Sequence, residues 1–98
     1  MEGIKALTLA SEISKLPDGN FTLVFFAYSR TKRSEVRLRT IKGCKVRKQL
    51  PQDAFDIDSD NYFLFTDGDG NPRTCYRILI RFIAFPHDGY KLRNVEWL

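Results

Sequence analysis

The sequence predicts a mainly β protein: a small antiparallel barrel or rolled sheet of five or six strands with a short N-terminal helix. Short runs rich in aromatic and β-branched residues recur along the chain, and several alternate between apolar and polar side chains, as half-buried strands do. Clusters of Gly, Pro, Asp and Asn separate these runs and are typical of tight turns. The 98 residues, 43% of them hydrophobic, suffice for one modest core, so we expect a single domain over residues 1–98.

The clearest strand pattern lies in residues 61–85. Two apolar runs flank residues 67–72, which are rich in Asp and Gly, so the segment is predicted to form a β-hairpin. We expect its second strand to continue to Phe85, because the next proline is Pro86. The buried face of that strand is predicted to carry Thr74, Tyr76, Ile78, Ile80 and Phe82, and the other face Arg73, Cys75, Arg77, Leu79 and Arg81.

Residues 8–16 are predicted to form the N-terminal helix. Thr8 is a suitable N-cap, and a proline-containing turn over residues 17–20 ends the helix. A helix of about two turns is not stable alone, so it must pack on the sheet. The face turned to the sheet is predicted to carry Leu9, Ile13 and Leu16.

Three strands are predicted in the first half of the chain. Residues 21–28, FTLVFFAY, form a strand buried on both faces and central in the sheet, and residues 29–33 form a basic hairpin loop. Residues 34–40 and 44–48 are strands separated by Gly43, an expected bulge or bend. Val36, Leu38 and Thr40 are predicted to point one way and Glu35, Arg37 and Arg39 the other, with Lys45 and Arg47 facing outward.

The remaining segments are a connection and a final strand. Residues 50–55 are expected to connect two strands, with Phe55 anchored in the core. Residues 90–98 are expected to form the last strand after a loop that begins at Pro86. The side chains predicted to pack from this strand are Val95, Trp97 and Leu98.

Residues 67–71 alternate oxygen-bearing side chains with glycine, as calcium-binding loops do. Counted from the first of these residues, an EF-hand fails because Pro72 takes the glycine position and Ile78 the position of the bidentate acid. Counted from Asp56, it fails because Asn61 replaces the glycine and an apolar strand lies inside the loop. Hairpin turns use the same residue types. We therefore interpret the segment as a turn and expect no metal or cofactor.

The sequence contains little that suggests catalysis. His87 is the one histidine, and Cys44 and Cys75 are the two cysteines, without the spacing of a zinc site or of a nucleophile and its base. We predict a non-enzyme. The cysteines could pair if their strands are neighbours, but we expect free thiols, because without a signal peptide the chain is expected in a reducing compartment. No apolar run approaches the roughly 20 residues that cross a bilayer, and the N-terminus has no basic leader. We therefore expect no membrane contact and a cytoplasmic or virion-associated location.

The net charge of +4 is distributed unevenly along the chain. Residues 30–48 contain nine Lys or Arg and one Glu, whereas residues 52–71 contain six Asp and no Lys or Arg. A basic hairpin and an acidic loop on one small body favour a non-catalytic binding or assembly module that docks a protein partner or further copies of itself.

The alternative function is a nucleic-acid-binding module that uses a basic sheet face. Ordinary solvated faces of antiparallel strands produce the same sequence pattern. A third interpretation, that these basic residues only face solvent and bind nothing, therefore stays open beside the two functions. The predicted binding residues are Arg30, Lys32, Arg33, Arg37, Arg39, Lys45, Arg47, Arg77 and Arg81, with Arg73 on the same predicted face.

The segments FTLVFFAYSRTKR, IKGCKVRKQLP and NYFLFTDGDGNPRTCYRILIRF resemble short proteins encoded in gut-bacterial genomes and in their phages or mobile elements. The resemblance covers residues 7–97. It implies an accessory or structural protein of a phage or mobile element, and it assigns no activity and no functional residues.

Overall fold

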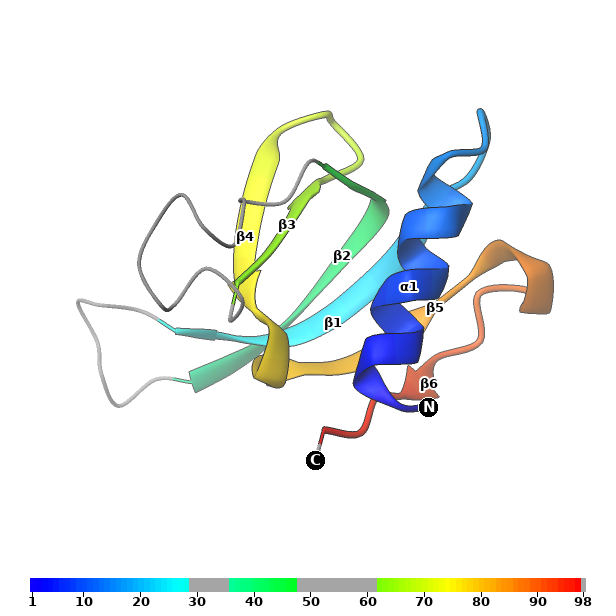
Figure 1. The fold of residues 1–98 in the computed structure, drawn as a ribbon. Helices are drawn as coiled ribbons and strands as arrows, with labels where there is room; N and C mark the ends of the chain where they lie inside the picture. Colours follow the sequence, from blue (N-terminus) through cyan, green and yellow to red (C-terminus); the bar gives the residue numbers. More distant parts are fainter. Residues whose placement is uncertain (29–35, 48–61, 98) are drawn as a thin grey trace, which may run out of the picture.

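The structure, a computed structural model, describes residues 1–28, 36–47 and 62–97. In these ranges the strands pair antiparallel in one six-stranded sheet of order β4-β3-β2-β1-β5-β6, which curls without closing (Figure 1). The predicted class, a mainly β rolled sheet with an N-terminal helix, is confirmed. The elements are α1 (Gly3–Ser14), β1 (Phe21–Tyr28), β2 (Val36–Val46), β3 (Tyr62–Thr66), β4 (Pro72–Tyr76), β5 (Ile80–Ala84) and β6 (Arg93–Asn94), with the 3₁₀ turns η2 (Arg77–Leu79) and η3 (Pro86–Asp88) on either side of β5.

Strand β1 is central, as predicted. It pairs with β2 on one side and with β5 on the other. Its first five residues are all buried, so the strand is covered on both faces. This burial explains why its sequence is continuously apolar and β-branched rather than alternating.

The core lies inside the curled sheet. We call the side of the sheet that carries Phe21, Leu23 and Phe25 the inner face. From β3, Phe63 and Phe65 point to the same core, with ring centroids 6.3 Å apart for Phe21 and Phe63 and 6.1 Å apart for Phe25 and Phe65. Aromatic pairs at these distances stabilise a core beyond their buried area.

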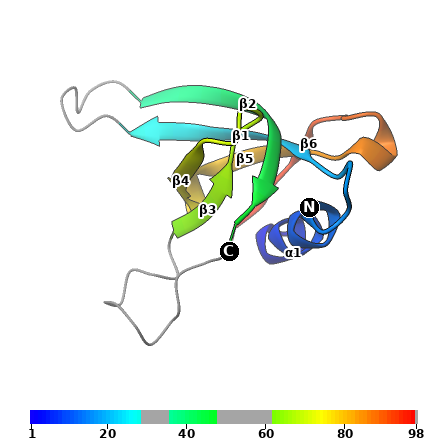
Figure 2. The same cartoon turned by 90° about the horizontal axis from the view of Figure 1, so that it is seen from above.

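Helix α1 packs against β1 and β2 (Figures 1 and 2). It begins at Gly3, so the prediction of a start at Thr8 is wrong. Long-range contacts set the start: the Gly3 amide donates to the Glu96 carbonyl at 2.8 Å, and the ring of Trp97 lies directly over Gly3. Thr8 lies within the helix, and its hydroxyl donates to the Ile4 carbonyl at 2.9 Å.

The buried face of α1 consists mostly of small residues, which allow the helix to approach the sheet closely. Of the three predicted contact residues, Ile13 is buried, Leu9 packs partly against the core, and Leu16 is exposed beyond the end of the helix. The buried positions are Gly3, Ala6, Ala10 and Ile13.

The two strands predicted on either side of Gly43 are one continuous strand, β2. Gly43 has φ 69°, and the register with β1 shifts between the pairs Phe21–Cys44 and Leu23–Ile41. The expected bulge at this glycine is therefore confirmed. It bends β2 so that its second half pairs with β3 instead of β1.

The hairpin of β3 and β4 around residues 67–71 is confirmed, but its second strand ends at Tyr76 instead of Phe85. Turn η2 then redirects the chain, and β5 pairs with β1. The predicted faces are wrong for β4 and η2: Tyr76 is 41% and Ile78 62% exposed, whereas Cys75 is 7% exposed. After the turn Ile80 is fully buried, as predicted.

The C-terminal segment contributes one short strand, β6, rather than a strand over residues 90–98. Val95 is buried as expected, and Trp97 packs against the core with its ring nitrogen donating to the Ile80 carbonyl at 2.9 Å. The predictions for the loop 29–33, for Phe55 and for Leu98 concern residues outside the described ranges.

Candidate functional site

A hollow of about 320 Å³ lies between β4 and the inner face of β1 and β2. On the side away from β3, β4 has no neighbouring strand among the described residues, and we call this side the free edge of β4. Four consecutive residues of β4 line it, so one wall is the edge of the strand itself and not only one of its faces. The full lining consists of Phe25, Phe26, Ala27, Arg39, Ile41, Tyr62, Arg73, Thr74, Cys75 and Tyr76.

The direction of the main-chain groups along β4 follows from the register. The Arg47 amide donates to the Leu64 carbonyl at 3.3 Å, so the main-chain groups of Leu64 point to β2. The main-chain N–H and C=O groups of successive residues alternate in direction along a strand, so the main-chain groups of Phe65 point to β4. Arg73 pairs with Phe65, and its own groups therefore point back to β3.

By the same alternation, the N–H and C=O groups of Thr74 and Tyr76 point away from β3 into the free edge. Pro72 supports this assignment, because a proline is tolerated in a strand where its missing N–H would face outward. Residue 74 is exposed at this edge, and within the described ranges no hydrogen bond other than those of the sheet reaches the main chain of Thr74. Tyr76 is the N-cap of η2, so its carbonyl accepts a hydrogen bond within that turn, and only its N–H is left at the edge. Among the residues that the structure describes, the hollow therefore has unpaired main-chain groups, namely the N–H and C=O of Thr74 and the N–H of Tyr76.

The floor of the hollow is apolar and includes Phe25, Ala27 and Ile41. Arg39 pairs directly with Phe25 across the two strands, so its side chain starts on the same inner face. It is exposed and has no hydrogen bond or ion pair with any residue that the structure describes. Arg39 therefore brings an uncompensated positive charge to the rim.

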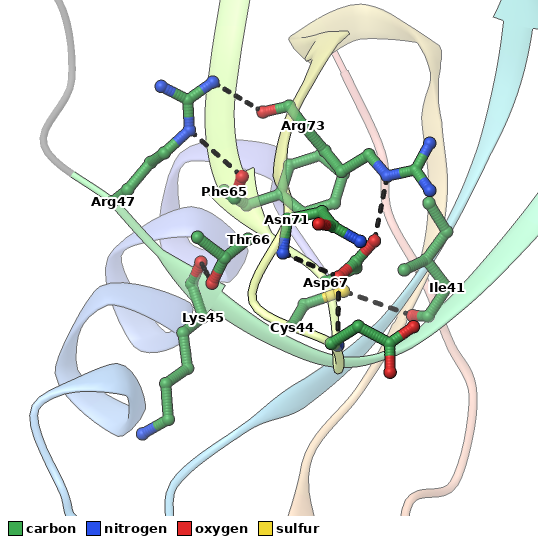
Figure 3. Close-up of polar contacts among 10 residues, drawn as sticks. Ile41, Cys44, Lys45, Arg47, Phe65, Thr66, Asp67, Asn71 and Arg73 are labelled. Carbon is green, nitrogen blue, oxygen red and sulfur yellow. Dashed lines mark hydrogen bonds and ion pairs between the residues drawn. The ribbon is translucent and has the colours of Figure 1, made fainter.

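Asp67 holds the hairpin turn and the second rim arginine (Figure 3). One of its carboxylate oxygens accepts the amides of Asp69 and Asn71, both at 3.0 Å, and the other accepts Arg73 Nε at 3.0 Å. The Asn71 amide, followed by the Arg73 side chain, lowers the pKa of this carboxyl group, which is 8% exposed. The interpretation of residues 67–71 as a turn is confirmed, and Arg73 reaches the hollow with its charge already balanced.

Arg47 has a structural role in the hairpin (Figure 3). Its Nε donates to the Phe65 carbonyl at 3.1 Å, and Nη2 donates to the Arg73 carbonyl at 2.9 Å. Nη2 also donates to Thr74 Oγ1 at 3.1 Å. This side chain thus ties β2, β3 and β4 together and is not a free cation.

The other predicted binding residues that the structure describes do not share one face of the sheet. Arg37 shares the inner face with Arg39, since it pairs with Ala27 two positions along β1. Arg81 lies 5.4 Å from the centroid of the Phe26 ring, on the opposite face of the sheet. The single basic sheet face that the nucleic-acid-binding alternative requires is therefore not formed by Arg37, Arg39 and Arg81.

Two further cations are bound to main-chain carbonyls. Arg77 Nε donates to the Tyr62 carbonyl at 3.1 Å, and Lys45 Nζ donates to the Leu16 carbonyl at 3.1 Å near the end of α1. The predicted residues Arg30, Lys32 and Arg33 lie outside the described ranges.

Sequence reasoning missed three residues of the hollow: Thr74, Tyr76 and Tyr62. The two tyrosine rings stack across β3 and β4 with centroids 4.9 Å apart. On β4, Thr74 and Tyr76 alternate with buried Cys75, and the predicted faces of these three residues are wrong because a single strand over β4 and β5 is expected from the sequence. The signal that was present is Pro72, which marks β4 as an edge strand.

The thiols are free, as the sequence predicts, but Cys75 lies on the buried face of β4 and not on the predicted outward face. Both cysteines are buried and unpaired, and His87 is exposed with its ring stacked on Phe85 at a centroid distance of 5.7 Å. Burial raises the pKa of Cys44 and of Cys75 to about 12, so neither forms a thiolate at neutral pH. Within the described ranges, no three His, Cys, Asp or Glu side chains are grouped as metal ligands.

The thiols are expected to be unreactive in the folded protein. At pH 8 a pKa of about 12 instead of 9.0 lowers the thiolate fraction about a thousandfold. A chromogenic disulfide reagent should therefore label neither Cys44 nor Cys75 until denaturant is added. Fast labelling of either thiol in the native state would contradict the burial described here.

The same shift has a consequence for stability at alkaline pH. The folded-state pKa is raised, so the neutral thiols favour the folded state fully below pH 9.0, the value of the unfolded chain. This contribution is lost as the pH rises from 9.0 through about 12. Replacement of Cys75 by alanine should reduce the loss, which is measured by denaturant unfolding at pH 8 and pH 10.

The site is thus a half-open hollow with a main-chain wall, an apolar floor and arginines at its rim. No helix among the described residues has the length and apolarity to span a bilayer. Comparisons of this chain with protein-family models, with curated proteins and with solved structures find no match.

Proposed function

We propose that the protein is a non-catalytic binding and assembly module that takes up an extended segment of a protein partner at the free edge of β4. The observation that carries this proposal is the main-chain wall of the hollow, formed by Thr74 and Tyr76. A strand added at such an edge gains hydrogen bonds from its main chain and specificity from its alternate side chains. A module of this kind suits an accessory or structural protein of a phage or mobile element.

The lining of the hollow indicates the chemistry of the segment. Arg39 has no acidic partner among the residues that the structure describes, so an acidic side chain is favoured at the rim. The apolar floor favours at least one apolar side chain between acidic neighbours. An extended segment in which apolar and acidic residues alternate meets both requirements.

A second candidate ligand is single-stranded nucleic acid. The stacked rings of Tyr62 and Tyr76 line the hollow together with Arg39, and nucleic-acid bases stack on exposed aromatic rings. The proposal of a protein ligand is preferred for an electrostatic reason. Nucleic-acid affinity comes largely from several cations that follow the phosphates. In the described ranges these cations are dispersed over both faces of the sheet or bound to carbonyls.

The test uses a fluorescein-labelled peptide of alternating valine and glutamate. Thr74→Pro removes the outward N–H of residue 74 and leaves the ladder with β3 intact, as Pro72 already does. Thr74→Val is the matched control, because it also lacks the hydroxyl that accepts from Arg47 but keeps the N–H. We expect fluorescence anisotropy to show that Thr74→Pro weakens binding about tenfold or more, while Thr74→Val binds as the wild type does.

Charge provides a second, independent readout. Arg39→Glu should weaken binding of the glutamate peptide, whereas Lys42→Glu, an exposed charge reversal outside the hollow lining, should not. A thymidine oligonucleotide is measured in parallel. If it binds more tightly than the peptide and Thr74→Pro leaves its affinity unchanged, the nucleic-acid function replaces the one proposed here.

A further inference from the structure

We infer that the segment taken up at the β4 edge is the acidic stretch of residues 55–60 of a second copy of this chain. This inference rests on the proposed function and names its ligand. In the sequence these residues read Phe-Asp-Ile-Asp-Ser-Asp, in which aspartates alternate with the apolar Phe55 and Ile57 and then with Ser59. They belong to the most acidic region of the chain, residues 52–71, which has six Asp and no Lys or Arg.

The chemistry of this stretch matches the lining. In an extended chain, successive side chains point to opposite sides, so Phe55, Ile57 and Ser59 share one side and the aspartates the other. An apolar side chain from the first set fits the floor formed by Phe25, Ala27 and Ile41. The carboxylates complement the rim, where Arg39 forms no ion pair within the described part of the chain.

Chain connectivity favours a second copy over the same chain. Residue 60 is two positions from Tyr62, where β3 begins. A strand added at the free edge of β4 lies two strand spacings from β3, about 10 Å. Residues 60 and 61 reach only about 7 Å when extended. The entire alternating stretch therefore pairs with β4 only when it comes from another molecule.

In this arrangement each copy supplies one segment and accepts one segment. The two surfaces differ, so the contact is head to tail and produces rings or open chains instead of a simple two-fold dimer. In this contact the acidic segment of one copy binds the edge of β4 of the next copy. Of the basic residues predicted from the sequence to bind a partner, it uses Arg39 and not the whole group.

The first experiment measures the mass of the full-length chain by sedimentation velocity over a range of concentrations. For the wild type, the average mass of the sedimenting species is expected to increase with protein concentration. Two variants should stay monomeric: Thr74→Pro, which blocks the edge, and the triple variant Asp56→Asn/Asp58→Asn/Asp60→Asn, which neutralises the segment. A control triple variant, Glu12→Gln/Asp18→Asn/Asp69→Asn, makes the same charge change at exposed positions and should assemble as the wild type does.

The decisive experiment mixes the two monomeric variants. Thr74→Pro keeps an intact segment, and the triple variant keeps an intact edge, so an equimolar mixture should form a one-to-one dimer and nothing larger. No other contact between copies predicts this restoration. Circular dichroism of both variants confirms that each is folded before mixing.

The outcomes separate this inference from the proposed function. If the valine–glutamate peptide binds while the wild type stays monomeric at every concentration, the inference is wrong and the function stands. If the Thr74→Pro variant assembles as well as the wild type and the valine–glutamate peptide does not bind, the inference and the proposed function are both wrong. A synthetic peptide of residues 52–61 that binds the triple variant but not the monomeric wild type would place the segment in its own hollow, which also overturns the inference.

Discussion

Replacement of Phe65 by alanine is expected to lower the free energy of unfolding by about 3–5 kcal/mol, the usual range for a buried phenylalanine. Phe65 is fully buried and contacts two other rings, Phe25 at a centroid distance of 6.1 Å and Phe63 at 5.7 Å. Its loss leaves a cavity that the neighbouring strands cannot fill, because β3 is held on both sides. Urea unfolding at neutral pH measures the change, which should appear in the midpoint without a change in slope.

The loss is large for a domain of this size, since total stabilities are about 5–15 kcal/mol. Leu38→Ala is the matched control. Leu38 is 51% exposed on the outer side of β2, so its truncation should change the stability by no more than about 0.5 kcal/mol. Equal losses for the two variants would show that Phe65 is not a core residue and would contradict the arrangement of β3 over β1.

The fold could be predicted where the signal is local. Strand β1 was predicted with its observed bounds because FTLVFFAY is apolar or β-branched at nearly every position. The hairpin turn was equally clear, since Asp67 and the glycines after it are the residues that the observed turn uses. Gly43 was recognised because a glycine inside an alternating run marks a bulge.

The errors arose where a distant part of the chain decides the local structure. Helix α1 starts at Gly3 because residues from the other end of the chain, Glu96 and Trp97, hold that position. Turn η2 contains neither glycine nor proline, and it forms because Ile80 pairs with Phe25 of β1 and not with β3. Alternation alone carries no information about such a change of partner.

For the candidate site, too, the features set by local sequence could be predicted and those set by long-range contacts could not. Arg39 was predicted from the alternation of its strand, and the structure places it at the rim of the hollow. The wall formed by Thr74 and Tyr76 was not predicted, because its chemistry belongs to the main chain and depends on which strand lies at the edge. Strand order is a long-range property, and only Pro72 gave a local indication of it.

The second large effect on stability is expected for Gly43→Ala, which should cost at least about 2 kcal/mol. Gly43 has φ 69°, in the left-handed region that costs an L-residue about 1–2 kcal/mol. In addition, a Cβ at this position would lie 2.9 Å from the Cα of Gly68, which is backbone and cannot turn aside as a side chain does. Denaturant unfolding measures the total cost.

Gly89→Ala is the control that separates the two causes. Gly89 has a similar φ of 70°, but a Cβ there would meet nothing within 4 Å, so only the conformational cost remains. The difference between the two variants is therefore the cost of pushing β2 away from the hairpin turn. Because Gly68 follows Asp67, which positions Arg73 at the hollow, Gly43→Ala should also weaken binding of the valine–glutamate peptide, and Gly89→Ala should not. Equal destabilisation with unchanged peptide binding would mean that β2 and the turn are not in contact, and the rim of the hollow would then need another support.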